Sequence, residues 1–189
     1  MNNKGSNPRN NISRSIPLIF IGIGLVIIGF VAIALLTNGQ NTNEYSVIPS
    51  EVNFPAPELT LNDLSGGKVS ITDYRQQVVL INNWATWCPP CKLEMPVLEK
   101  YFREHTEQGF ILIGIEAGDP VDEVTSFVNK YNLTFPILLD PNNKSMLAFH
   151  NDNLPSSYVI DPNGNVVLAW TGPISHTMLE KYVTPLLEQ

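Results

Sequence analysis

The sequence predicts an α/β protein in which a central mixed β-sheet is flanked by helices on both faces and preceded by one transmembrane helix. Three observations predict this. Residues 16–36 contain no charged side chain. Residues 54–189 alternate short apolar runs, typical of buried strands, with segments of helical periodicity. The two cysteines of the chain, Cys88 and Cys91, lie where a predicted strand turns into a predicted helix.

The N-terminal residues are predicted to anchor the chain in the cell membrane as a single-pass protein. Residues 1–15 carry three basic residues and no acid. Residues 16–36 would span roughly 31 Å as a helix, close to the ~30 Å hydrocarbon core of a bilayer. The positive-inside rule then keeps the N-terminus in the cytoplasm and makes the following domain extracytoplasmic. The alternative is a cleaved signal peptide with Ala32-Ile33-Ala34 as the processing site.

Polar residues 37–53 are expected to form a linker, and residues 54–189 one folded domain. The linker contains Asn, Gln, Thr and Ser, and as a flexible coil it would span roughly 20–25 Å. After residue 15 the chain holds eight of its 11 basic residues and all 18 acidic ones. Such an acidic body argues against nucleic-acid binding, because neutralising phosphates requires a basic face.

Strands and helices alternate along the predicted domain. The continuous apolar run Val78-Val79-Leu80-Ile81 fits a strand that is buried on both faces. The turn Asp161-Pro162-Asn163-Gly164 predicts a hairpin, and Pro185 should end or kink the last helix. In order, we expect strands at 58–61, 69–71 and 78–81, a helix at 89–105, a strand at 110–115, a helix at 121–131, a strand at 135–139, a helix at 144–149, strands at 157–160 and 166–170, and a helix at 175–187.

Cys88 and Cys91 are predicted to form a redox-active pair rather than a structural disulfide. A two-residue gap closes so small a loop that the bond removes little entropy from the unfolded chain. Three residues apart at the start of a helix, the two thiols share one face and lie within disulfide range. Unpaired N–H groups and the helix dipole favour the thiolate of Cys88. We therefore expect Cys88 to be the exposed attacking thiol and Cys91 the resolving one.

Other residues near the pair have candidate roles. Glu94 lies one turn beyond Cys91 and could exchange a proton with its thiol, or else be a solvated residue that pairs with Lys92 or Lys100. Asn82, which cannot titrate, should point toward the region under Cys91. We expect Trp87 to cover the pair and contact the substrate. Pro89 and Pro90 lack N–H donors, which favours a reducing or intermediate potential.

The segment from Val78 to Pro96, with its core Trp84-Ala85-Thr86-Trp87-Cys88-Pro89-Pro90-Cys91, resembles the extracytoplasmic, membrane-anchored thioredoxin-like proteins of the TlpA/ResA type. The similarity covers about residues 54–187. It includes Phe54-Pro55-Ala56-Pro57, Phe135-Pro136 and Leu154-Pro155-Ser156-Ser157-Tyr158-Val159-Ile160-Asp161. Two departures are Asn83, where the family usually has an aromatic or apolar residue, and Ser156-Ser157, which replaces a commoner pair of threonines.

The resemblance implies a thioredoxin-like fold and a thiol–disulfide oxidoreductase, most simply a protein-disulfide reductase. Pro155 matches a cis-proline that faces the cysteine pair, and with Leu154 it would bind an extended substrate peptide. Glu94 matches an active-site glutamate. The implied partners are disulfide-bearing client proteins, among them apocytochrome c during cytochrome c maturation, and a membrane thiol-electron donor. No cofactor or metal is expected.

Two alternatives on the same fold are a copper-binding assembly chaperone and a peroxiredoxin-type peroxidase. A copper-binding assembly chaperone would have three residues between the cysteines and a suitably placed histidine, whereas His105, His150 and His176 are scattered along the chain. A peroxiredoxin-type peroxidase would have a threonine three residues before the reactive cysteine, where Ala85 stands. Both patterns differ from this sequence, so the oxidoreductase is favoured.

Overall fold

The computed structural model describes residue 29 and residues 46–188. The predicted basic N-terminus (1–15), transmembrane helix (16–36) and most of the linker (37–53) lie outside the described residues, apart from Gly29 and residues 46–53. Within the described part of the chain, no helix has the length and apolar character needed to cross a membrane.

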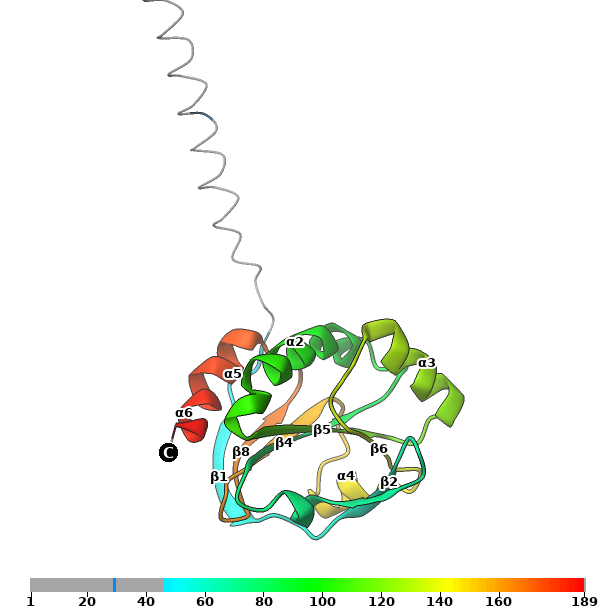
Figure 1. Ribbon diagram of the computed structural model, residues 1–189, viewed down its shortest axis with the longest axis horizontal. Coiled ribbons are helices and arrows are strands. Elements are labelled where there is room, and N and C mark those ends of the chain that lie inside the picture. Colours follow the sequence, from blue (N-terminus) through cyan, green and yellow to red (C-terminus); the bar gives the residue numbers. More distant parts are fainter. Residues whose placement is uncertain (1–28, 30–45, 189) are drawn as a thin grey trace, which may run out of the picture. The chain divides into compact units, whose positions relative to one another are not determined.

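One eight-stranded mixed sheet forms the centre of the domain (Figure 1). Its strands lie side by side in the order β1-β8-β7-β4-β5-β6-β2-β3. The inner strands β4, β5 and β6 are parallel, and β7 pairs antiparallel to β4. The strands are β1 (Ser50–Pro55), β2 (Thr60–Asp63), β3 (Lys68–Ser70), β4 (Val78–Trp84), β5 (Phe110–Glu116), β6 (Ile137–Leu139), β7 (Ser156–Ile160) and β8 (Asn165–Thr171).

Helices cover both faces of this sheet, as predicted (Figure 1). One face carries α2 (Pro89–His105), α3 (Val121–Tyr131) and α5 (His176–Tyr182), and the other carries α4 (Lys144–Ala148). A short α6 (Thr184–Leu187) follows α5. The predicted limits of α2 and α3 agree with the structure at both ends, because the proline pair starts α2 and a left-handed Asn132 ends α3.

Strand β4 separates two hydrophobic cores. Leu80 and Trp84 pack in the core beneath α2, whereas Val79 and Ile81 pack in the core on the opposite face. All seven residues of β4 are buried, because successive side chains of a central strand alternate between two covered faces. The same alternation sends Asn82 toward α2 and Asn83 toward α4.

Most predicted strand limits shift by one to three residues, and the differences near the start of the domain matter most. The domain begins before residue 54, since β1 starts at Ser50 and pairs antiparallel with β8. The strand expected at 58–61 is instead β2, which begins at Thr60, where pairing with both β3 and β6 becomes possible. The predicted interruption of the last helix near Pro185 is confirmed: the helix is divided at Val183, because proline cannot supply an N–H to a continuous helix. The predicted hairpin turn is confirmed between β7 and β8.

Candidate active site

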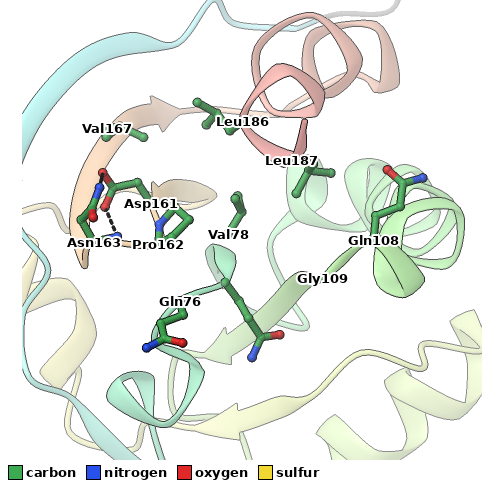
Figure 2. A pocket seen from close by; sticks show the side chains of 11 residues that line it. Gln76, Val78, Gln108, Gly109, Asp161, Pro162, Asn163, Val167, Leu186 and Leu187 are labelled. Carbon is green, nitrogen blue, oxygen red and sulfur yellow. Dashed lines mark hydrogen bonds between the residues drawn. The ribbon is translucent and has the colours of Figure 1, made fainter. Parts of the chain in front are cut away.

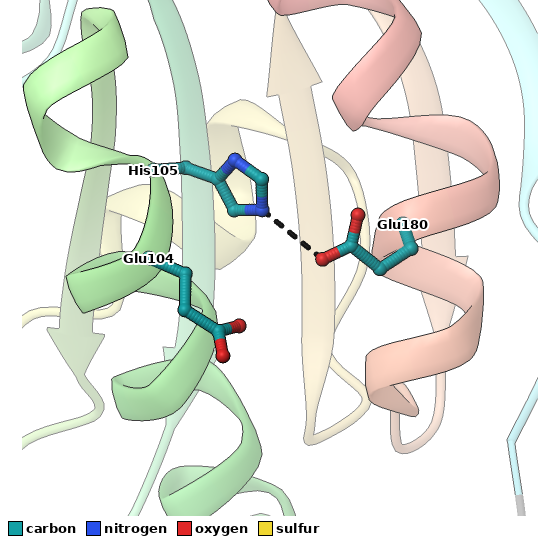
Figure 3. A group of neighbouring side chains, drawn as sticks. All are labelled: Glu104, His105 and Glu180. Atoms are coloured by element: carbon teal, nitrogen blue, oxygen red, sulfur yellow. Dashed lines mark hydrogen bonds and ion pairs between the residues drawn. The ribbon is translucent and has the colours of Figure 1, made fainter.

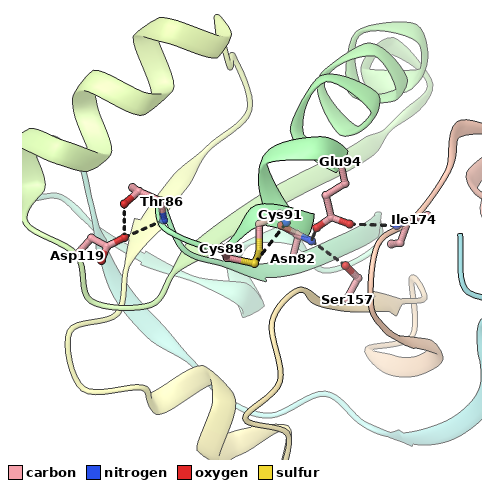
Figure 4. The surroundings of a disulfide bond; sticks show 8 residues. All are labelled: Asn82, Thr86, Cys88, Cys91, Glu94, Asp119, Ser157 and Ile174. Atoms are coloured by element: carbon pink, nitrogen blue, oxygen red, sulfur yellow. Dashed lines mark hydrogen bonds between the residues drawn. A yellow bond between two sulfur atoms is a disulfide. The ribbon is translucent and has the colours of Figure 1, made fainter. Parts of the chain in front are cut away.

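Cys88 and Cys91 form a disulfide at the N-terminus of α2 (Figure 4). Cys88 is the N-cap residue, and its Sγ accepts a hydrogen bond of 3.3 Å from the Cys91 N–H. The two Cα atoms are 5.3 Å apart. Pro89 and Pro90 occupy the first two helical positions, where a missing N–H costs little. The Cys91 N–H is therefore the backbone donor that this helix end directs at Cys88, as the sequence predicted.

The exposure of Cys88 differs from the expectation. Cys88 retains 3% of its surface and Cys91 none, so both belong to the buried set. In this disulfide form the Cys88 sulfur lies against the helix end, where it is bonded to Cys91 Sγ and accepts the Cys91 N–H. Trp87 stands at the surface beside the pair with 64% of its area exposed, while Trp84 is fully buried and has the packing role.

Glu94 is buried beside the disulfide, with 1% of its surface exposed. Its Oε1 accepts a hydrogen bond of 2.7 Å from Asn82 Nδ2, and its Oε2 accepts one of 3.1 Å from the Ile174 N–H (Figure 4). Burial raises the pKa of Glu94 to about 8, against the opposing effect of these two hydrogen bonds. A solvated residue paired with Lys92 or Lys100 is excluded by this burial. Its catalytic role stays a prediction.

Strand pairing brings Pro155 to the same end of the sheet. The Leu154–Pro155 peptide bond is cis, as the resemblance implied. In the antiparallel ladder of β4 and β7, Ser156 stands opposite Asn83, so Pro155 lies at the end of β4 from which the chain continues to Cys88. The Pro155 carbonyl accepts a hydrogen bond of 2.8 Å from the Gly172 N–H. Leu154 is partly buried beside it.

Comparisons with known proteins agree with this geometry. A model of the AhpC/TSA family matches residues 52–169. The chain is 33% identical over 132 residues to the thiol-disulfide oxidoreductase ResA of Geobacillus kaustophilus (strain HTA426), covering 70% of this chain and 76% of that protein. It is 30% identical over 128 residues to the ResA of Bacillus subtilis (strain 168), covering 68% and 72%. The crystal structure of a thiol:disulfide interchange protein of the thioredoxin family from Chlorobium tepidum TLS aligns with a TM-score of 0.65 and 26% identity, covering 73% and 99%.

The chain belongs to the AhpC/TSA family. It is a thiol–disulfide oxidoreductase with a thioredoxin-like fold, which confirms the resemblance to the TlpA/ResA type and the enzyme class predicted from the cysteine spacing.

Asn83 and the serine pair Ser156-Ser157, the two departures of this oxidoreductase from the family pattern, are joined by a hydrogen bond. Asn83 is fully buried, and its Nδ2 donates to Ser156 Oγ over 3.2 Å. Its Oδ1 accepts a hydrogen bond of 2.6 Å from Ser145 Oγ, on α4. On the opposite face Asn82 Nδ2 donates to Ser157 Oγ over 2.9 Å. The serine pair therefore supplies one acceptor to each asparagine, which the sequence could not reveal without the register of β4 and β7.

A carboxyl pair beside the active-site loop of this family member was missed by sequence reasoning. Asp119 Oδ2 accepts hydrogen bonds from the Thr86 N–H at 2.8 Å and from Thr86 Oγ1 at 2.7 Å (Figure 4). Glu116, the last residue of β5, accepts hydrogen bonds from the Gly118 and Asp119 N–H groups. Burial, and next its hydrogen bond with Asp119, raise the pKa of Glu116 to about 7. One signal in the sequence could have indicated this carboxyl pair. Glu116 is an acid at the end of a predicted buried strand, and that strand runs parallel to the one before Cys88.

We predict that Asp119→Asn destabilises the protein by about 1–2 kcal/mol, because an amide replaces the charged acceptor of two hydrogen bonds from Thr86. Urea unfolding of the oxidised protein would measure this loss. Asp122→Asn, at an exposed position in the first turn of α3, is the matched control and should cost only a few tenths of that value. Equal losses in the two variants would show that Asp119 does not hold the loop.

A pocket of about 520 Å³ lies away from this chemistry (Figure 2). Its lining includes Val78, the first residue of β4, whereas the cysteines follow the last residue of that strand. None of the predicted site residues lines it. We therefore assign the reaction to the end of β4 and not to this pocket.

Proposed function

We propose that this protein is a membrane-tethered, extracytoplasmic reductase of protein disulfides. The observation that carries the proposal is the Cys88–Cys91 disulfide at the start of α2, with the buried carboxyl group of Glu94 beside it. The tether and the location rest on residues 1–36 of the sequence, with their basic start and uncharged segment. Apocytochrome c is the client that the resemblance suggests.

In the proposed reaction the reduced enzyme gives two electrons to a client. The Cys88 thiolate attacks one sulfur of the client disulfide, which forms a mixed disulfide and releases the other client sulfur as a thiolate. Cys91 then loses its proton and its thiolate attacks Cys88 Sγ. This step restores the Cys88–Cys91 bond and releases the second client sulfur, and solvent protons complete both client thiols. A membrane dithiol, oxidised to its disulfide in turn, would reduce the pair again.

Glu94 is the proposed acceptor of the Cys91 proton. A carboxyl group with a pKa of about 8 is close to the ordinary value of a thiol near 8.5, so a proton passes between the two groups with little change in free energy. Cys91 has no exposed surface, so bulk water does not reach it easily in this form. The ionised form of Glu94, whose fraction grows as the pH approaches 8, can accept that proton at the resolving step.

Client binding is proposed at Trp87, Leu154 and Pro155. The exposed indole of Trp87 offers an apolar surface next to Cys88. Because the Pro155 carbonyl already accepts the Gly172 N–H, an extended client segment would pair with the backbone of Leu154 instead. This arrangement would place a client disulfide against Cys88.

The two other functions find less support. Thr86 donates its hydroxyl hydrogen to Asp119, and Ala85 stands three residues before Cys88, which argues against a peroxidase of the peroxiredoxin type. In the described residues, the only group of metal-ligating side chains lies near the C-terminal end of α2, away from the cysteines at its N-terminus, which argues against a copper site that uses these cysteines.

Reduction of insulin disulfides by the full-length protein in detergent, with dithiothreitol as electron source, tests the reaction. We expect insulin to precipitate faster than with the Cys88→Ser variant, with no peroxide consumption and no copper retention that depends on Cys88 and Cys91. An equal rate for the two proteins would refute the proposed activity. A thiol reagent that cannot cross membranes tests the location, since it should label Cys88 in intact cells after mild reduction, and labelling only after cell lysis would refute it.

We predict that Pro89→His raises the reduction potential of the pair. The variant restores an N–H at the first helical position and adds a partly positive imidazole, and both stabilise the Cys88 thiolate and hence the reduced form. A rise of about 30 mV or more, which is a tenfold change in the equilibrium constant, is expected in a glutathione redox titration. Leu93→His, at an exposed position in the same helix, is the control and should leave the potential nearly unchanged. An unchanged potential in Pro89→His would contradict this account.

A further inference from the structure

Glu104, His105 and Glu180 lie together between α2 and α5 (Figure 3). A second histidine, His176, lies near both glutamates. His105 Nε2 lies 3.1 Å from Glu180 Oε1. His176 Nε2 lies 2.6 Å from Glu104 Oε2 and 3.7 Å from Glu180 Oε1. Glu104 and His105 end α2, whereas His176 and Glu180 share one face of α5 with a spacing of four residues.

These separations suit a tetrahedral metal ion. Nitrogen and oxygen ligands lie about 2.0–2.2 Å from Zn²⁺, so two ligand atoms of a tetrahedral site are roughly 3.3 Å apart. The three distances between histidine nitrogen and glutamate oxygen atoms, 2.6, 3.1 and 3.7 Å, are spread around that value. One ligand atom from each of Glu104, His105 and Glu180 lies within 4.8 Å of the others.

The atoms of these residues that point away from the cluster already have partners. His105 Nδ1 lies 3.3 Å from Gln108 Oε1, and an N–H at that position leaves Nε2 with the lone pair that a metal requires. Glu180 Oε2 accepts a hydrogen bond of 2.8 Å from Thr184 Oγ1. Glu104 Oε1 is 3.8 Å from Lys100 Nζ. Such outer contacts orient the ligands of known metal sites.

We propose that His105, His176, Glu104 and Glu180 bind one divalent transition-metal ion of the Zn²⁺ class. Two imidazoles and two carboxylates are ligands that Zn²⁺ accepts, and the ion would balance the two negative charges. The helix α2 has 17 residues, so this site lies roughly 24 Å along it from the disulfide. The ion would join α5 to the end of α2 and take no part in thiol exchange.

Titration of the untagged, full-length protein with Zn²⁺ tests the proposal, using oxidised protein so that no thiolate competes for the ion. We expect one ion per chain by calorimetry, a rise in Tm of at least about 3 °C, and visible absorption typical of tetrahedral geometry when Co²⁺ is the probe. Histidines and glutamates that only share protons in ion pairs would give none of these signals, and that result would overturn the proposal.

Variants at the more exposed ligands locate the ion, because His105 is buried and its replacement could impair folding. His176→Asn and Glu104→Gln should each weaken Zn²⁺ binding about 100-fold or more, since loss of an outer partner alone costs about 10–100-fold. The matched controls His150→Asn and Glu107→Gln remove the same chemical groups outside the cluster and should change binding less than about twofold. Binding that survives both ligand variants, or falls equally in the controls, would overturn the proposal.

Discussion

Cys91→Ala is expected to convert this oxidoreductase from a catalyst into a covalent trap. The variant keeps Cys88 at the helix N-terminus, where the N–H of residue 91 still stabilises its thiolate. It lacks the second sulfur that would resolve the mixed disulfide. Turnover should therefore fall by at least about 10³-fold, since removing one member of a catalytic unit in a serine protease costs about 10⁴- to 10⁶-fold. Non-reducing gels of cells that express the variant should show client proteins bound to it, and mass spectrometry would identify them.

Cys88→Ala is the matched control for this trap. Cys91 has no exposed surface and lies one turn inside the helix, so a client disulfide should not reach it. We therefore expect no covalent complexes and no insulin reduction with Cys88→Ala. Complexes of equal abundance in both variants would contradict the assignment of Cys88 as the attacking thiol and Cys91 as the resolving one.

Glu94→Gln is expected to stabilise the protein at alkaline pH and to abolish part of its pH dependence. The pKa of Glu94 is about 8 in the folded protein, above its ordinary value of 4.5, so the folded state keeps a proton that the unfolded state releases. Unfolding therefore becomes more favourable as the pH rises from about 4.5 to 8. At about 1.4 kcal/mol per pH unit, the wild-type protein should lose roughly 5 kcal/mol of unfolding free energy over this range through Glu94 alone.

Glutamine can occupy the same site without ionising. Its amide would need an acceptor in place of one of the two N–H groups that face Glu94, and rotation of the Asn82 side chain can supply its Oδ1, which has no hydrogen-bond partner among the described residues. Urea unfolding at pH 5 and pH 8 would measure the effect as the difference between wild type and variant. Glu107→Gln, at an exposed position beyond the end of α2, is the control. Parallel pH profiles for wild type and Glu94→Gln would show that Glu94 is not buried as a neutral acid.

The sequence predicted the helix limits of this domain correctly where the residues that set them act locally. The limits of α2 and α3 follow from Pro89 at one start and from Asn132 just after one end, and both residues act on the backbone next to them. The first four residues of β1, Ser50–Asn53, fall in the predicted linker, because the polar residues Ser50, Glu51 and Asn53 show no alternation. Its strand conformation depends on hydrogen bonds to β8, more than 100 residues away in the chain.

In the candidate site, too, some features follow from adjacent residues and others only from the pairing of distant strands. The spacing of Cys88 and Cys91 predicted a disulfide pair at a helix start, since three residues cover less than one helical turn. The burial of Glu94, the partners of Asn83 and the contact of Asp119 with Thr86 depend on strand register and could not be read from spacing. The contacts of Asn83 and Asp119 join residues at least 33 positions apart. The burial of Glu94 depends on which face of α2 packs against the rest of the domain.

Residues close in the chain thus settled the kind of chemistry, because a thiol pair at a helix end needs no distant partner to be recognised. The pairing of β4 with β5 and β7 settled which polar groups surround that pair and which of them lose water. Desolvation changes the pKa of a carboxyl group, and desolvation arises only when distant segments pack against it. For the same reason, the approach of His105 and His176 to one oxygen atom of Glu180 is a property of the packed helices and not of their sequence spacing.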